Sequence, residues 1–285
     1  MNIVSGYRSD KQLRDSFNAL AEQTFGLNFE GWYQNDFWKE NYDPHSVVEN
    51  GTVLSNVSVN RTDLLIDGRQ YRILQLGTVM TAEGCRGRGF GRAIMEHIEQ
   101  KYADVDGIYL FANDSVVDYY PRFGFRPAVE HTYSKRVTMT GETQAEQVLM
   151  DGPAAWEQLR AAMAKSTFRE GCPMVENPGL IFFYVSQFMQ EAVYYIPHLD
   201  AWVIAEPEEE SLTIHNIFAD ETVTIDAVAA AFGKVQQLSL GFAPADSTGW
   251  DITELHEEDT HFFVKGAVFE AFEQKKLRIP SLSHA

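Results

Sequence analysis

Residues 86–91 read Arg-Gly-Arg-Gly-Phe-Gly, and this segment constrains the fold more than any other part of the 285-residue chain. A strand-like run at 71–81 precedes it, and an amphipathic helix expected at 89–101 follows it. The free N–H groups at the start of such a helix, together with the positive end of its dipole, form an anion-binding site. Glycines let the backbone approach a phosphate closely. The segment is therefore either a pyrophosphate-binding turn or a simple strand-to-helix turn.

Three arginines, Arg86, Arg88 and Arg92, favour anion binding because they add charge-assisted donors in an otherwise acidic chain. Similar glycine spacing occurs in dinucleotide-binding proteins. There the helix follows the first strand of a parallel sheet, and an acidic residue ends the second strand about 20 residues on. Here the helix follows an antiparallel meander, and the corresponding region is a helix end and a loop. The context argues against a dinucleotide site.

The first part of the chain is predicted to contain a helix, an antiparallel meander and a strand–helix–strand unit. Asn50-Gly51 and Asp67-Gly68 are hairpin-turn dipeptides between short strand-like runs. The expected elements are a helix at 10–25, strands at 46–50, 52–59, 62–67 and 71–81, a helix at 89–101, a strand at 108–112, a short helix at 115–120 stopped by Pro121, and strands up to about 140. This order predicts an α+β fold with a mixed, mostly antiparallel twisted sheet flanked by helices.

The second part opens with a helix that Asp151 can cap, with Pro153 in its first turn. The elements expected after it are strands at 180–186, 192–196, 200–205 and 211–218, a helix at 224–233, and strands at 236–242 and 260–265. We therefore expect two domains, residues 1–145 and 150–285, that repeat one architecture. The loop at 218–222 is where the second domain would carry its own phosphate turn. It has no glycine and two carboxylates, which would repel a pyrophosphate.

The segment Arg86–Gly91 resembles the signature of the GNAT superfamily, the general-control-related N-acetyltransferases, which reads Arg/Gln-x-x-Gly-x-Gly/Ala between a strand and a helix. The segment Tyr120–Phe125, Tyr-Pro-Arg-Phe-Gly-Phe, is similar to the family's downstream Tyr-x-x-x-Gly-Phe. The resemblance covers about residues 2–140. It is closest to the two-domain bacterial branch, including the N-terminal part of the enhanced-intracellular-survival type.

The resemblance implies the acyl-CoA N-acyltransferase fold with acetyl-CoA as co-substrate. The residues that it assigns to the coenzyme site are Val79, Met80, Thr81, Arg86, Gly87, Arg88, Gly89, Phe90, Gly91, Arg92 and Asn113. It also implies that Tyr120 is the catalytic acid that protonates the departing thiolate. The second domain would be a degenerate GNAT-like domain without a coenzyme site, which would wall the acceptor site or support a homodimer.

Several of these residues have a simpler structural interpretation. Tyr120 could pack on the sheet, with Tyr119 as the acid. Asn113 could cap a turn at the end of a strand. Glu83, which stands where such families have proline, is interpreted as a solvated carboxylate rather than a proton relay. Cys85 is interpreted as a packed small residue.

The formal net charge of −18 argues against a nucleic-acid partner. It suits a cationic amine acceptor, because a negative field concentrates cations, although it could also serve only solubility. No run of about 18 apolar residues and no apolar signal core occur, so we expect a cytoplasmic protein without a membrane partner. His256 and His261 lie in an acidic stretch that reads as a solvated loop, and no metal site is expected.

We therefore expect an enzyme, an N-acetyltransferase that moves an acetyl group from acetyl-CoA to a small-molecule or peptide amine by direct attack in a ternary complex. The alternative from another class is a non-catalytic acyl-CoA-binding sensor or regulatory module. A third interpretation is an acyl chain other than acetyl, with Met80 and Phe111 setting the length of its pocket.

Overall fold

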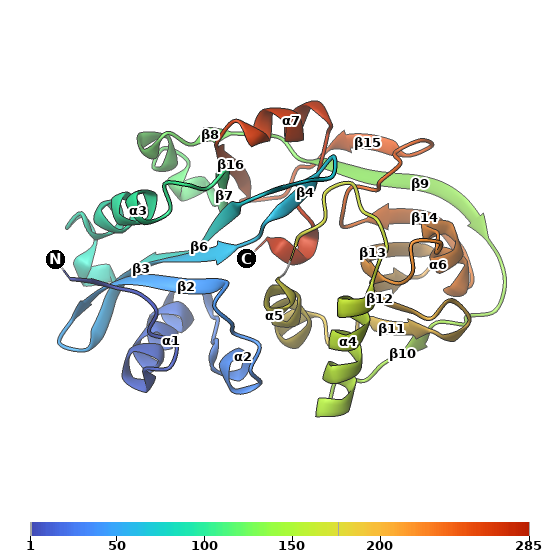
Figure 1. Cartoon of the computed structure of the whole chain (residues 1–285), viewed down its shortest axis with the longest axis horizontal. Coiled ribbons are helices and arrows are strands. Elements are labelled where there is room, and N and C mark those ends of the chain that lie inside the picture. Colours follow the sequence, from blue (N-terminus) through green and yellow to red (C-terminus); the bar gives the residue numbers. More distant parts are fainter. Residues whose placement is uncertain (1, 176, 285) are drawn as a thin grey trace.

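The computed structural model describes residues 2–175 and 177–284, which form two seven-stranded sheets and a short two-stranded one (Figure 1). The first sheet has the order β1 (Ile3–Val4), β2 (Tyr42–Glu49), β3 (Thr52–Arg61), β6 (Ile73–Thr81), β7 (Gly107–Ala112), β16 (His261–Lys265), β8 (Arg126–Pro127). The second has the order β10 (Glu146–Gln147), β11 (Val193–Ile196), β12 (Ala201–Glu208), β13 (Ser211–Phe218), β14 (Val235–Leu240), β9 (His131–Met139), β15 (Asp251–Glu254). The third pairs β4 (Leu64–Ile66) with β5 (Arg69–Tyr71).

The helices are α1 (Lys11–Phe25), α2 (Glu30–Gln34), α3 (Phe90–Lys101), α4 (Pro153–Lys165), α5 (Pro178–Phe188), α6 (Ile225–Ala231) and α7 (Val268–Gln274). In the described residues both large sheets are antiparallel except for one pair each, β6–β7 and β13–β14. Helix α3 or α6 connects the two strands of each parallel pair. The predicted α+β class with mixed, mostly antiparallel sheets is confirmed. No helix in the described ranges is long and apolar enough to cross a bilayer.

The two sheets exchange strands. Strand β9, which follows the first strand–helix–strand unit in sequence, lies in the second sheet between β14 and β15. Strand β16, near the end of the chain, lies in the first sheet between β7 and β8. The strands of the two sheets therefore do not separate between residues 145 and 150. The division of the chain into domains at residues 1–145 and 150–285 stays a prediction. Each half contributes a strand to the sheet of the other.

The two hairpin turns form where the dipeptides predict them. Asn50 and Gly51 have φ of 49° and 76°, and Asp67 and Gly68 have φ of 52° and 76°. Positive φ at both central residues gives a turn whose twist matches that of the flanking strands. These turns connect β2 to β3 and β4 to β5.

Two predictions about the second half are wrong. The segment at 180–186, expected as a strand, belongs to helix α5, which Asn177 caps by accepting a hydrogen bond from the N–H of Leu180. Helix α5 is apolar on nearly every face, so its sequence carries no helical period to distinguish it from a buried strand. Asp151 does not cap α4, because Gly152 occupies the N-cap position without a side-chain hydrogen bond.

One prediction about the first half also differs from the structure. The short helix expected at 115–120 is instead two 3-10 turns, Asp114–Val116 and Tyr120–Phe123.

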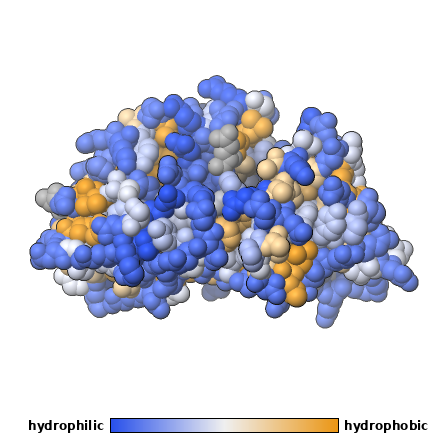
Figure 2. Space-filling model, turned by 60° about the horizontal axis from the view of Figure 1, so that its bottom comes forward, coloured by the Kyte–Doolittle hydropathy of each residue, from blue (hydrophilic) through white to orange (hydrophobic). Residues whose placement is uncertain are grey.

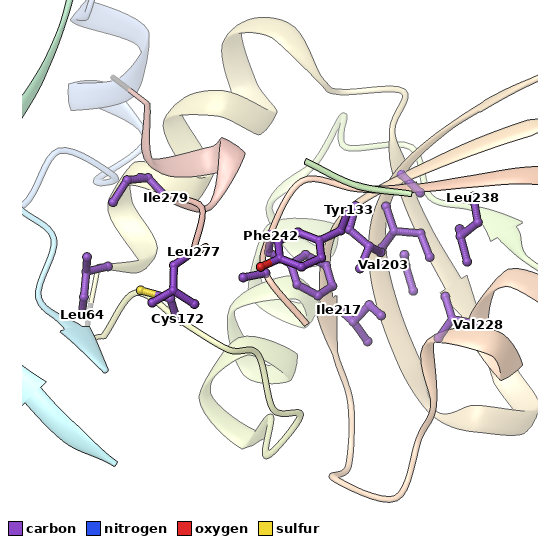
Figure 3. Packing of buried hydrophobic residues seen from close by; sticks show 14 of the residues in the cluster. Leu64, Tyr133, Cys172, Val203, Ile217, Val228, Leu238, Phe242, Leu277 and Ile279 are labelled. Atoms are coloured by element: carbon purple, nitrogen blue, oxygen red, sulfur yellow. The ribbon is translucent and has the colours of Figure 1, made fainter. Parts of the chain in front are cut away.

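Three apolar clusters hold these layers together. Figure 3 shows part of one, which runs from Leu64 of β4 to Val228 of α6 and so joins the two halves. A second cluster packs α1, α2 and α5 against each other. The third lies between the first sheet and α3. Helices α1 and α2 therefore cover the face of the first sheet opposite to α3, and α5 extends that layer (Figure 1).

Candidate active site

Strands β6 and β7 separate as they run toward their carboxyl ends. Their parallel pairing covers only Ile73–Leu76 and Gly107–Leu110, although β6 continues to Thr81 and β7 to Ala112. A cavity of about 990 Å³ opens at this splay. Residues 76–81 of β6 and 111–112 of β7 line it, together with Asn113. The unpaired edges offer backbone donors and acceptors to an extended ligand, much as an added strand would use them.

A β-bulge shapes β6 at the splay. Asn56 of β3 pairs with Met80 and Ser58 pairs with Gly77, so two residues of β6 lie opposite the single residue Val57. Thr78 takes the strained φ of 49° at the bulge. The side chain of Asn56 donates to the Thr78 carbonyl at 2.9 Å, which holds the bulge in place. Bulges of this kind redirect backbone groups beside active sites.

The glycine-rich turn forms an open cradle at the N-terminus of α3. Gly87 and Gly89 have φ of 75° and 78°, in the left-handed region, and a Cβ at either would meet no atom within 4 Å. Gly89 is the N-cap of α3, with no side-chain hydrogen bond and no acidic residue in the first turn. The first N–H groups of α3 therefore remain available to an anion.

The arginines of this region divide into two groups. Arg86 and Arg92 line the cavity, and so does Arg122, which the sequence analysis did not single out. Arg88 does not line it. Its guanidinium lies 4.5 Å from the ring centre of Phe90 and 3.5 Å from a carboxylate oxygen of Glu49. The remaining residues assigned to the coenzyme, from Val79 to Asn113, line the cavity.

Tyr120 lies at the start of the 3-10 turn after the splay. It is 4% exposed and lines the cavity, and its hydroxyl has no hydrogen-bond partner among the described residues. Burial, and secondarily the neighbouring Tyr119, raises the pKa of Tyr120 well above its ordinary value, so the phenol keeps its proton. A buried phenol with a free hydroxyl facing a cavity can donate a proton there.

Two of three comparisons with known proteins agree with this geometry. The family model described as a GNAT acetyltransferase domain matches residues 8–128. No curated protein matches the chain. Residues 8–128 are a GNAT acetyltransferase domain.

Solved structures extend the likeness across the chain. A conserved protein of Enterococcus faecalis V583, described as a probable N-acyltransferase, is 15% identical with a TM-score of 0.60, over 95% of this chain and 73% of that one. Eis1 of Mycobacterium abscessus is 14% identical with a TM-score of 0.56, over 92% and 73%. A GCN5-related N-acetyltransferase of Kribbella flavida is 16% identical with a TM-score of 0.54, over 93% and 72%. At these identities the likeness is one of fold.

The other residues weighed around the GNAT motif have local partners. The Oδ1 of Asn113 accepts from the hydroxyl of Ser115 at 2.8 Å, as a turn-capping asparagine does. Glu83 is exposed and does not line the cavity. Cys85 is half-buried and does line it. His256 and His261 pair with Glu254 and Asp114, and no group of three metal-ligating side chains occurs in the described part of the chain.

The far side of the cavity belongs partly to the second half of the chain. Leu180, Phe183, Tyr184 and Phe188 of α5 line it. So does His284, next to the end of the chain, which motif reasoning missed because it belongs to no motif. The GNAT domain therefore does not enclose its own site.

The counterpart of the glycine-rich turn in the second half, between β13 and α6, is already occupied by its own carboxylates. Asp220 accepts from the N–H and the hydroxyl of Thr222, at 3.0 and 2.6 Å, and these bonds lower the pKa of Asp220. Glu221 pairs with Arg169. An anion would have to displace these carboxylates. The absence of a second coenzyme site stays a prediction.

Proposed function

We propose that this protein is an acetyl-CoA-dependent N-acetyltransferase that acts by direct attack of an amine on the thioester. The family supports an acyl-CoA-dependent N-acyltransferase, and the acetyl group and the direct attack are our additions. One observation carries the proposal: a single cavity joins the glycine-rich turn, the splay between β6 and β7, and the Tyr120 phenol.

The cradle supplies the coenzyme site. Gly87, Gly89 and the first N–H groups of α3 would face the pyrophosphate, with Arg86 and Arg92 as charged donors. Val79, Met80 and Thr81 would pair with the pantetheine arm and place the thioester at the splay. This arrangement leaves the acyl carbon near the bulge of β6.

The chemistry then needs few protein groups. The neutral amine attacks the thioester carbonyl and forms the C–N bond, while a backbone N–H near Met80 stabilises the oxyanion of the tetrahedral intermediate. Breaking the C–S bond releases a thiolate, which takes the proton of Tyr120, and the new amide loses its extra proton to solvent. Solvent then returns a proton to Tyr120.

An amine-panel assay that reads free thiol release from acetyl-CoA tests this proposal. The expected result is amine-dependent thiol release with one acetyl amide formed per thiol. Thiol release that is slow and independent of the amine across the whole panel would instead favour a non-catalytic acyl-CoA sensor.

A further inference from the structure

Six aromatic residues from the helices on the opposite side of the first sheet to α3 line the cavity, and we call them the aromatic wall: Phe25, Phe29, Trp32, Phe183, Tyr184 and Phe188. These residues come from α1, the segment after it, α2 and α5. Phe29 stacks on Phe183 with ring centroids 5.2 Å apart and planes at 11°. The wall is therefore an ordered surface built jointly by the two halves of the chain.

The polar groups of this wall are already used within the protein. Trp32 Nε1 donates to the carbonyl of Gly179 at 2.8 Å. The hydroxyl of Tyr184 is hydrogen-bonded to the backbone of His284. What these two side chains present to the cavity is mainly ring surface, which favours an apolar ligand.

The charge of the cavity contrasts with that of the chain. The formal net charge is −18, yet no aspartate or glutamate of the described residues lines the cavity. The charged lining residues are Arg86, Arg92 and Arg122, near the coenzyme end. A polycation would meet positive charge and no carboxylate partner there.

The wall also reaches solvent. Among the described residues four large hydrophobic side chains are exposed, and the two aromatic ones, Phe25 at 45% and Phe188 at 59%, both line this cavity. Hydrophilic residues dominate the face of the molecule in Figure 2, and apolar groups form only small patches on it. Exposed aromatic rings at the mouth of a cavity mark an entrance for an apolar ligand.

We propose that the amine acceptor carries an aromatic or other apolar body, which packs against the aromatic wall, and has no second cationic group. This inference rests on the proposed acetyltransferase function. The wall also aids the reaction, because an apolar environment disfavours the ammonium form and so raises the fraction of neutral, attacking amine.

A long acyl chain on the coenzyme is the competing occupant of the wall. Phe25 and Phe188 end α1 and α5, in the layer that covers the first sheet opposite to α3. The coenzyme cradle lies at the start of α3. The solvent-exposed rings therefore mark a mouth apart from the cradle, as a second substrate requires.

The test compares amines and variants under saturating acetyl-CoA. Tryptamine, phenethylamine and hexylamine are assayed beside spermidine and agmatine. We expect kcat/KM for tryptamine to exceed that for spermidine at least tenfold. Phe188→Ala and Phe25→Ala should each lower kcat/KM for tryptamine about three- to tenfold, because aromatic contacts of this kind contribute that much. Leu149→Ala removes an apolar side chain that is 67% exposed outside the cavity and serves as the matched control, with no change expected.

The contrary outcomes separate the two proposals. A preference for spermidine would overturn the apolar acceptor and leave the acetyltransferase standing. If Phe188→Ala changes the preference among acetyl-, hexanoyl- and decanoyl-CoA but not among amines, the wall holds an acyl chain and this inference is wrong. Absence of thiol release with every amine would overturn the acetyltransferase itself.

Discussion

The imidazole of His284 stacks on the ring of Phe111, with centroids 4.2 Å apart and planes at 22°. Phe111 belongs to β7 at the splay, whereas His284 is the last but one residue of the chain. The Nε2 of His284 lies 3.2 Å from the carbonyl of Ile279, to which it can donate. His284 and Phe111 thus line the cavity side by side, next to the proposed position of the acyl group.

His284→Ala is expected to lower kcat/KM for the acceptor about three- to tenfold, because ring stacking of this kind contributes ~0.5–1.5 kcal/mol. Coenzyme affinity should not change, since the glycine-rich turn does not involve His284. Steady-state kinetics and coenzyme titration measure the two effects. His284→Phe keeps an aromatic ring and should restore most of the loss. If it does not, the imidazole does more than pack.

Tyr120→Phe is expected to lower kcat at least a hundredfold while coenzyme binding is retained, because it removes the proton donor but keeps the packing. Burial raises the pKa of Tyr120, so the phenol holds its proton through the assay range, and kcat should not fall up to about pH 10. Kinetics against pH with both variants measures this. Tyr119→Phe is the control. Equal losses in the two variants, or near-full turnover of Tyr120→Phe, would refute the acid role.

Gly89→Ala is expected to weaken coenzyme binding and to lower the free energy of unfolding by about 1 kcal/mol, because φ of 78° disfavours any residue with a Cβ. Gly84→Ala is the control, since Gly84 does not line the cavity, does not have positive φ, and a Cβ added there would meet no atom within 4 Å. Calorimetric titration with coenzyme A and urea unfolding report the two quantities. Equal behaviour of the two variants would contradict the cradle geometry.

How much of this could be predicted from the sequence depends on how local each feature is. The turn at Arg86–Gly91, helix α3 and the hairpin at Asn50-Gly51 follow from residues close together in the chain, and all form as predicted. The pairing of β16 with β7 does not follow from neighbouring residues, because periodicity identifies a strand but not the strand with which it pairs. Helix α5 has no polar face from which its helical period could be recognised. The aromatic wall could therefore not be predicted either, because three of its residues belong to α5.

Asp43 links stability to pH. Burial alone would raise the pKa of its carboxyl, but hydrogen bonds from His45 and from the N–H of Gly6, at 2.7 Å, together with Lys101, bring it to about 2. A lowered carboxyl pKa contributes stability that is complete above the unfolded value of about 4 and is lost as pH falls toward 2.

The contribution of Asp43 corresponds to about 2 kcal/mol at neutral pH. Asp43→Asn should therefore lower the free energy of unfolding by about that amount at pH 7, and much less near pH 2. Urea unfolding across this pH range measures the difference, with Asp15→Asn as a surface control. A destabilisation that stays constant from pH 7 to pH 2 would show that packing, not charge, is responsible.

A fragment that ends at residue 145 tests the strand exchange. It lacks β16, whose residues 261–265 pair with β7 and whose Phe263 packs 5.9 Å from Tyr120, measured between ring centroids. Without β16, β7 and β8 would be left as unpaired edges. The fragment also lacks α5, so the aromatic layer would be uncovered. We expect the fragment to aggregate or to unfold without a cooperative transition, whereas co-expression with residues 146–285 should restore a soluble complex that binds coenzyme A. Cooperative urea unfolding of the fragment alone, with coenzyme affinity equal to that of the full chain, would show instead that the first sheet is complete without its exchanged strand.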